Sequence, residues 1–192
     1  PTDAAERAEQ LDLPDDFLLA VGTLDPRRGL TSLITGLGQP DAPDLPLLVL
    51  GPDSWGELTL AAVADEAGLP EGRVRALGYL SDADLAVVLD RASVFIYPSL
   101  HEGFGLPLVE AFTFGTPVVH SDDPALVEVA GGAGIAVERG KKGYPERLVA
   151  AISSVLDDAD KAAHLAVAGA DRARAFSWRD SAERVWALHA DL

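Results

Sequence analysis

Two glutamates, Glu102 and Glu110, stand with seven residues between them in the segment HEGFGLPLVEAFTFGTPVV, residues 101–119. Gly103 and Gly105 follow the first glutamate, so a glycine-interrupted turn leads toward the second. Where such a turn opens a helix, free backbone N–H groups and the positive end of the helix dipole suit an anion such as a phosphate. Helical side chains lean toward the N-terminus, so we expect Glu110 to face the same crevice as Glu102.

The combination of an anion site with two carboxylates indicates a particular kind of ligand. In dinucleotide-binding folds, an acidic residue takes the ribose hydroxyls while the turn holds the pyrophosphate. The residue types in this segment therefore predict a site for a nucleoside diphosphate that carries a hydroxyl-rich group.

The elements around this segment predict an α/β fold, because strand and helix patterns alternate along the chain. We expect a Rossmann-like, doubly wound, mainly parallel six-stranded sheet with helices on both faces and a C-terminal helical tail. The strands are expected at residues 17–22, 45–51, 73–78, 93–98, 116–120 and 134–137. The helices are expected at residues 30–37, 57–67, 84–92, 107–114, 126–130, 145–156 and 161–176, with a last one capped by Ser177.

The composition limits the classes of partner. The 192 residues carry a net charge of -16, with a pI near 4.4, which disfavours sequence-independent binding to nucleic acid and makes any anion site depend on local donors. The absence of cysteine fits a reducing cytosol. No run of roughly 18 apolar residues and no charged-then-apolar leader occurs, so we expect a soluble cytoplasmic protein without a transmembrane segment.

The loop at residues 23–29 supplies two cations, Arg27 and Arg28, directly after the first strand. Ligands of open α/β sheets bind at the carboxyl ends of strands, and two guanidinium groups there can neutralise a pyrophosphate through forked hydrogen bonds. Solvated surface charge is the commoner explanation for an arbitrary pair of arginines. The residues alone leave both explanations open.

The turn at residues 78–82 has a structural explanation of its own. Ser81 is a natural N-cap for the helix expected at residues 84–92, and Asp84 stands three residues further on, as in a variant of the capping box. Helix-start chemistry therefore accounts for Ser81 and Asp82 without any ligand.

Several motifs together resemble family 4 of the retaining GT-B glycosyltransferases. The donor-site signature of that family is similar to Glu-Gly-Phe-Gly-Leu-Pro at residues 102–107, a second glutamate at 110 and Gly-Thr-Pro-Val-Val at residues 115–119. Three further stretches follow the order of the family: VGTLDPRRG at residues 21–29, LGYLSDADL at 77–85 and the Phe-Ser-Trp helix start at 176–178. The resemblance spans nearly the whole chain and implies the C-terminal, nucleotide-sugar-binding half of such an enzyme.

The resemblance also implies roles for single residues. Glu102 is implied to contact the donor sugar and to support charge at the anomeric carbon, which makes it the candidate catalytic residue. Arg28 falls at the usual lysine position of a basic pair that reaches the diphosphate, whereas Thr23 stands at the earlier arginine position, so Arg27 is the weaker candidate. The implied donor-binding residues, with Leu80 and Asp82 beside the base, are Gly22, Arg27, Arg28, Leu80, Asp82, Gly103, Phe104, Gly105, Leu106 and Glu110.

Partners and boundaries follow from the same resemblance. The donor is a UDP- or GDP-linked sugar, no metal or cofactor is required, and the acceptor is held by an N-terminal domain that this chain lacks. We expect a linker or arm at residues 1–14, a donor-binding domain at 15–140 and helices at 141–192, the last of which crosses toward the N-terminal domain. Any membrane association is expected to run through that other domain.

Other chemistries find less support. No G-x-G-x-x-G follows the first strand, which argues against a dinucleotide-dependent dehydrogenase. Ser99 and His101 lack the G-x-S-x-G elbow of a hydrolase, and the four histidines are not spaced as metal ligands. A glycoside hydrolase needs one carboxyl group with a raised pKa, whereas the helix dipole is expected to favour the charged form of Glu110.

Three hypotheses from different classes remain. The first is the donor-binding half of a retaining glycosyltransferase. The second is a GT-B relative that handles a nucleotide sugar without transfer, such as an epimerase or a hydrolase. The third is a non-catalytic binding domain with a decayed site.

Overall fold

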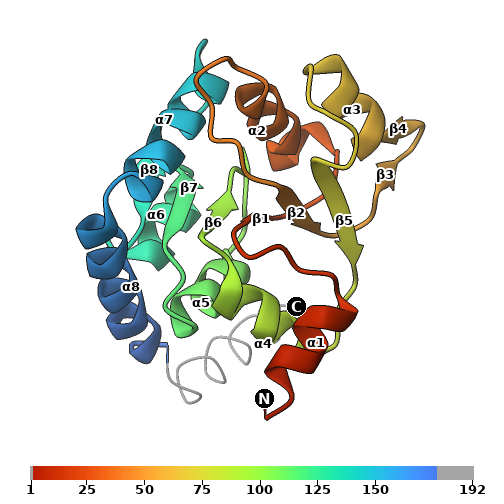
Figure 1. Cartoon of the computed structure of the whole chain (residues 1–192). Helices are drawn as coiled ribbons and strands as arrows, with labels where there is room; N and C mark the ends of the chain where they lie inside the picture. The colour runs from red at the N-terminus through yellow and green to blue at the C-terminus, as the bar shows by residue number, and fades with distance from the viewer. Residues whose placement is uncertain (1, 177–192) are drawn as a thin grey trace, which may run out of the picture.

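A six-stranded parallel sheet forms the centre of the computed structural model, which describes residues 2–176 (Figure 1). The strands are short apolar runs, as expected where both faces of a sheet are covered. They are β1 (Leu18–Val21), β2 (Leu47–Leu50), β5 (Val74–Gly78), β6 (Val94–Tyr97), β7 (Val118–Ser121) and β8 (Ile135–Val137), in the spatial order β5-β2-β1-β6-β7-β8. Every neighbouring pair is parallel, and the winding reverses between β1 and β6 as in dinucleotide-binding folds. The predicted fold class is confirmed.

Helices cover both faces of this sheet (Figure 1). One face carries α2 (Leu30–Leu37), α3 (Leu60–Glu66) and α7 (Tyr144–Leu156), and the other carries α4 (Asp82–Arg91), α5 (Leu106–Thr113) and α6 (Pro124–Ala130). A final described helix, α8 (Ala159–Arg174), packs against α5 and α7.

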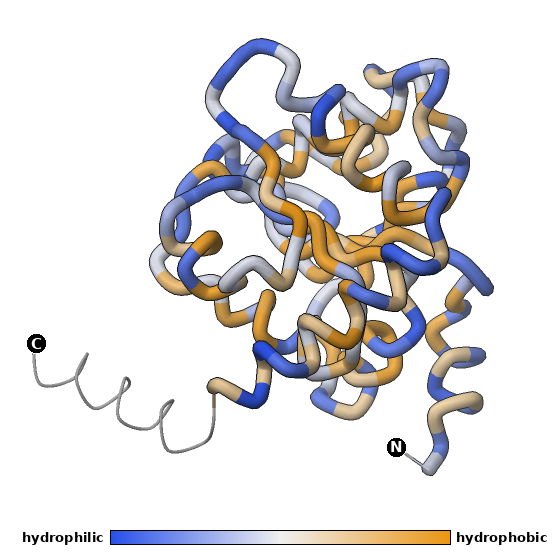
Figure 2. The backbone as a smooth tube through the Cα atoms, turned by 90° about the vertical axis from the view of Figure 1, so that its left-hand side faces the viewer, coloured by the Kyte–Doolittle hydropathy of each residue, from blue (hydrophilic) through white to orange (hydrophobic). Residues whose placement is uncertain are grey.

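The core is divided into two apolar clusters by the sheet. Leu18 and Ala20 of β1 point into one cluster, while Phe17 and Leu19 point into the other, because successive side chains of a strand face opposite sides. Figure 2 shows hydrophobic stretches of the backbone concentrated inside the molecule and hydrophilic segments around them.

The segment expected to be a linker or arm contains a helix, α1 (Ala4–Gln10). It packs against α4, where Nη1 of Arg7 lies 2.9 Å from Oδ1 of Asp84 and Ala8 is buried. The sequence offers few apolar positions here, so the helix depends on tertiary contacts that the local pattern does not reveal.

The helix expected at residues 57–67 begins later than predicted. A short antiparallel hairpin, β3 (Ser54–Trp55) with β4 (Leu58–Thr59), precedes it. Thr59 then caps α3, its hydroxyl accepting a hydrogen bond from the backbone N–H of Ala62 at 3.1 Å. The cap fixes the start of the helix at Leu60.

The expected last helix from Ser177, and its crossing toward an N-terminal domain, lie outside the described residues. Within residues 2–176, no helix is both long and apolar enough to traverse a lipid bilayer.

Two loops at the carboxyl edge of the sheet are tied together. The backbone N–H of Leu100, after β6, donates to the carbonyl of Arg27, after β1, at 2.8 Å. Gly29 has a φ of 71°, and a Cβ at this position would lie 2.0 Å from the carbonyl oxygen of Pro98. Only glycine therefore allows the β1–α2 loop to lie this close to the strand end of β6.

We predict that Gly29→Ala lowers the free energy of unfolding by about 3 kcal/mol or more, because it adds a clash to the unfavourable left-handed backbone. The matched control is Gly72→Ala, since Gly72 has a φ of 81° but no neighbouring atom within 4 Å of an added Cβ. That control is expected to cost only about 1 kcal/mol from the backbone term. Chemical denaturation measures both, and equal losses would contradict the tight approach of the two loops.

Candidate functional site

Two adjoining cavities lie at the carboxyl ends of the central strands, around the point where the sheet reverses its winding. Loops that follow the strands run to opposite faces here, which leaves the crevice where open α/β sheets bind ligands. The Glu110 cavity has a volume of about 210 Å³ and the Glu102 cavity of about 250 Å³, each named after its carboxylate. Val21, the last residue of β1, lines both. The two glutamates therefore border adjacent spaces.

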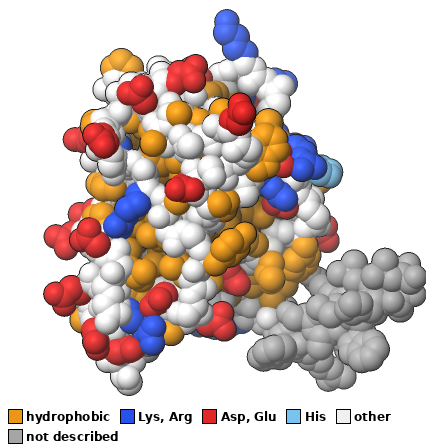
Figure 3. Space-filling view, turned by 90° about the vertical axis from the view of Figure 1, so that its right-hand side faces the viewer, with side chains coloured by type: hydrophobic (Ala, Val, Ile, Leu, Met, Phe, Trp, Pro, Cys, Tyr) orange, Lys and Arg blue, Asp and Glu red, His pale blue; other side chains and the backbone are white. Residues whose placement is uncertain are grey.

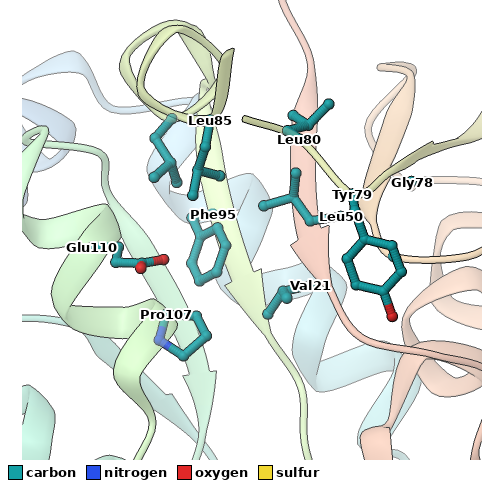
Figure 4. Close-up of a pocket in the computed structure, with 11 residues that line it drawn as sticks. Val21, Leu50, Gly78, Tyr79, Leu80, Leu85, Phe95, Pro107 and Glu110 are labelled. Atoms are coloured by element: carbon teal, nitrogen blue, oxygen red, sulfur yellow. The ribbon is translucent and has the colours of Figure 1, made fainter. Parts of the chain in front are cut away.

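The Glu110 cavity has mainly apolar walls. Figure 4 shows Pro107 and Glu110 of α5 on one side, Leu80 on the opposite side, and Val21 and Phe95 between them. The remaining lining residues are Leu50, Gly51, Gly78, Tyr79, Leu85 and Leu89. An apolar slot with one carboxylate at its rim suits a flat ring that is attached to a hydroxylated group.

The Glu102 cavity holds a charged cluster. Nη1 of Arg28 lies 2.5 Å from Oε1 of Glu102, and the hydroxyl of Tyr97 donates to the same oxygen at 2.7 Å. Burial, together with the hydrogen bond to Glu102, raises the pKa of Tyr97, so its hydroxyl remains a donor. Gly22 and Thr23 also line this space, so the threonine at the family's arginine position faces the cavity.

Arg27 faces elsewhere. Its guanidinium donates to both carboxylate oxygens of Asp25, the shorter contact being 2.6 Å, and its side chain is 75% exposed. Its hydrogen bonds lower the pKa of Asp25 to about 2. Asp25 also caps the short 3₁₀ turn at Pro26–Arg28 by accepting from the backbone N–H of Arg27 at 3.0 Å. Arg27 lines neither cavity, whereas Arg28 reaches the crevice.

The pKa of Glu110 shifts in the direction opposite to the one expected from the helix dipole. The pKa of Glu110 is raised, first because the surroundings remove part of its hydration and second because Asp82 repels its negative charge. Glu110 is the fifth residue of α5, beyond the first turn in which the helix dipole acts strongly. Because the folded state holds this proton more tightly than the unfolded chain, stability from this group falls as pH rises through the window between the two pKa values.

The turn after β5 reaches the crevice with one of its two candidate residues. Leu80 lines the Glu110 cavity. Ser81 caps α4, its hydroxyl accepting from the backbone N–H of Asp84 at 3.2 Å, which confirms the predicted cap. Asp82 is exposed at the start of α4 and lines neither cavity, yet its negative charge contributes to the raised pKa of Glu110.

The glycine turn connects the two glutamates without lining either cavity. Gly105 caps α5 with a φ of 80°, and a Cβ there would lie 2.6 Å from Cδ2 of Leu126. Phe104 is 39% exposed and lies edge-on to Phe176, with 6.2 Å between the ring centres. Gly103 and Leu106 are also exposed. The turn therefore opens α5, and none of its four implied donor-binding residues lines either cavity.

Two tyrosines belong to the site and were missed from the sequence. Tyr97 ends β6 and donates to Glu102, and Tyr79 lines the Glu110 cavity although the residue is 93% exposed. A signal was available for Tyr97, because a hydroxyl at the end of a buried strand needs a partner. An aromatic residue in the turn after a strand is a similar but weaker signal for Tyr79.

Charge around the site is local. Figure 3 shows acidic side chains spread over the face seen there, with lysines and arginines at separate places. Among residues 2–176, no group of three or more His, Cys, Asp or Glu is arranged to hold a metal ion. Arg28 is the basic residue among those that line the two cavities.

Comparison with known proteins assigns the family. The chain matches the family described as "Glycosyl transferases group 1" over residues 2–172. It belongs to this family of glycosyltransferases. Its fold is that of the C-terminal domain of GT-B enzymes. Because the pKa of Glu110 is raised, the charge of this carboxyl group gives no argument against a glycoside hydrolase, whereas the family match is to transferases.

Individual relatives agree with this assignment. The chain is 35% identical over 168 residues to O-antigen chain mannosyltransferase B of Escherichia coli, covering 85% of this chain and 43% of that protein. Sucrose-phosphate synthase from Thermosynechococcus elongatus is 27% identical with a TM-score of 0.76, covering 97% of this chain and 48% of its own. Anabaena Alr3699/HepE in complex with UDP-glucose is 24% identical with a TM-score of 0.81, covering 100% and 53%. The chain spans about half the length of these proteins.

We predict that Asp82→Asn lowers the pKa of Glu110 toward its ordinary value, because it removes the repelling charge while desolvation persists. Carboxyl-carbon NMR across a pH titration measures this pKa. Asp90→Asn is the control, since Asp90 is an exposed acid about 12 Å further along α4 at the rise of an α-helix. An equal effect from both variants would exclude the specific contribution of Asp82.

Proposed function

We propose that this chain is the donor-binding half of a retaining, metal-independent glycosyltransferase, which moves a sugar from a nucleoside-diphosphate sugar to an acceptor. The observation that carries the proposal is the charged cluster of Arg28 and Glu102 beside the apolar Glu110 cavity. One cation and two carboxylates in adjoining spaces match a ligand with a diphosphate between two hydroxyl-rich groups.

The ligand is proposed to run along the carboxyl edge of the sheet. The base enters the Glu110 cavity against Leu80, with Asp82 nearby, and the ribose hydroxyls donate to Glu110. The diphosphate crosses Val21 toward Arg28 and Gly22, with the glycine turn and the start of α5 (Gly103, Phe104, Gly105 and Leu106) alongside it. The sugar then lies at Glu102. UDP-glucose in the Anabaena structure supports a donor of this class, and a GDP-linked sugar fits the same chemistry.

The chemistry assigned to these residues is charge stabilisation. In transfer, the bond between the anomeric carbon and the diphosphate oxygen breaks, the oxygen of the acceptor hydroxyl forms the new bond to that carbon, and the proton of the hydroxyl passes to the departing diphosphate. Arg28 neutralises the leaving diphosphate, while the carboxylate of Glu102 stabilises positive charge at the anomeric carbon. Both effects grow as the bond breaks, so they favour the transition state over the bound donor.

The acceptor site is proposed to lie in the remainder of the protein. The E. coli mannosyltransferase is more than twice as long as the matched part, which leaves room for an N-terminal, acceptor-binding domain. In this proposal, residues 15–140 form the donor domain and residues 141–192 the helices that connect it to its partner. The location is proposed to be cytoplasmic, with any membrane contact made by the partner domain.

We predict that Arg28→Ala weakens the binding of UDP or GDP by about tenfold or more, the scale of a hydrogen bond to a charged group. Arg27→Ala is the matched control, because Arg27 is the adjacent residue of the same type but pairs with Asp25. It is expected to change affinity less than about twofold. Calorimetry with each nucleotide measures both affinities. A larger loss of affinity in Arg27→Ala than in Arg28→Ala would contradict the proposed path of the diphosphate.

We predict that Glu110→Ala weakens nucleotide binding by about 1 to 3 kcal/mol, because the ribose hydroxyls lose a charged acceptor. Glu146→Ala, an exposed acid in the first turn of α7, serves as the control and is expected to have no effect. Isothermal titration of the 192-residue chain measures both. Unchanged affinity in Glu110→Ala would remove this residue from the site.

A third expectation concerns catalysis. The 192-residue chain is predicted to bind a nucleotide sugar without transferring it, because the acceptor platform lies elsewhere. Product analysis of the full-length enzyme with UDP-, GDP- and ADP-sugars is expected to show transfer to an acceptor. Efficient transfer by the 192 residues alone, or release of free sugar as the main product of the full-length enzyme, would overturn the proposal.

A further inference from the structure

Tyr97 is held rigidly at the end of β6. It pairs in register with His120 of β7, and its ring stacks on Phe95 with 6.2 Å between ring centres and an interplanar angle of 18°. Only 6% of the residue is exposed. Its hydroxyl therefore has a fixed position at the carboxyl edge of the sheet, whereas Glu102 lies in the loop that follows.

Both donors to Glu102 meet one oxygen. Arg28 and Tyr97 contact Oε1, and within residues 2–176 Oε2 accepts no hydrogen bond. The two donors differ in mobility, because the side chain of Arg28 is 40% exposed and Tyr97 is buried. A partly exposed ion pair is weak in free energy, so Arg28 can exchange its partner readily.

We propose that Tyr97 is a positioning residue, which keeps Glu102 oriented toward the donor sugar when Arg28 turns from this carboxylate to the diphosphate. This inference rests on the proposed function. Arg28 and Glu102 form an ion pair and neutralise each other. Once the diphosphate takes Arg28, the hydrogen bond from Tyr97 to Oε1 holds the carboxylate, and Oε2 faces the sugar hydroxyls.

The arrangement separates two parts of donor binding. Nucleoside diphosphate alone uses Arg28 and the Glu110 cavity and does not need an oriented Glu102. The sugar needs Glu102 at a defined place. Loss of the Tyr97 hydroxyl is therefore expected to reduce the contribution of the sugar and to spare that of the nucleotide.

The test measures the sugar factor, defined as the dissociation constant of the nucleoside diphosphate divided by that of its sugar conjugate. Calorimetry on the 192-residue chain uses UDP with UDP-glucose and GDP with GDP-mannose. The wild type is expected to give a sugar factor above one for at least one pair. Tyr97→Phe is expected to lower that factor by about fivefold to tenfold, the scale of one hydrogen bond to a charged group, while the nucleoside diphosphate binds within about twofold of wild type.

Tyr144→Phe is the matched control. It also removes a buried tyrosine hydroxyl near the end of β6, where Tyr144 donates to the carbonyl of Pro98 at 2.8 Å, but it does not contact Glu102. Its sugar factor is expected to equal that of the wild type. A double-mutant cycle adds the second criterion: in a Glu102→Ala background, Tyr97→Phe is expected to have no further effect on the factor, because Tyr97 acts through Glu102.

Four results of this test would count against the proposal or its premise. Equal weakening of diphosphate and sugar conjugate by Tyr97→Phe, or an undiminished effect in the Glu102→Ala background, overturns the role of Tyr97. A wild-type sugar factor of one overturns it as well, while leaving nucleotide binding intact. If the wild type binds none of the four nucleotides, the proposed function itself fails.

Discussion

The close contact between the β1–α2 and β6–α5 loops is the constraint on which the site depends. Strands β1 and β6 are neighbours, but the chain leaves them toward opposite faces of the sheet. Gly29 against Pro98 and the hydrogen bond from Leu100 to Arg27 draw the two loops together again. This contact brings Arg28 onto Glu102 although 73 residues separate them in sequence. Without it, the cation and the catalytic candidate would belong to separate surfaces.

The electrostatics follow from a strongly acidic chain that is proposed to bind an anion. A net charge of -16 gives no long-range attraction for a diphosphate, so affinity must come from donors at contact distance. Arg28 is such a donor, and it is paired with Glu102. Binding then exchanges one charged partner for another, which costs less than stripping water from an unpaired guanidinium. The raised pKa of Glu110 fits the same pattern. Its carboxylate is partly desolvated, so hydroxyl donors stabilise it more than they would stabilise a fully hydrated carboxylate.

The sequence predicted the sheet well, because each core strand is an apolar run between glycine, proline or charged residues, and the order of strands follows from alternation with helices. The sequence predicted less well the features that depend on contacts between residues distant in sequence. The helix α1 depends on Ala8 and Arg7 packing against α4, and the raised pKa of Glu110 depends first on desolvation and then on the charge of Asp82 of α4. The difference between Arg27 and Arg28 depends on the 3₁₀ turn, from which one side chain pairs with Asp25 and the other with Glu102. The hydrogen bond from Tyr97 to Glu102 likewise needs the loop after β6 to fold back, so that two residues five positions apart in sequence meet.

A crystal structure of this chain with a bound nucleotide sugar, UDP-glucose or GDP-mannose, tests the central claim most directly. The account predicts the base among Leu80, Leu85 and Phe95, ribose oxygens within hydrogen-bond distance of Glu110, the diphosphate on Arg28 and the sugar beside Glu102. A nucleotide bound outside the crevice between β1 and β6, or one lying with its base at Glu102 and its sugar at Glu110, would contradict it.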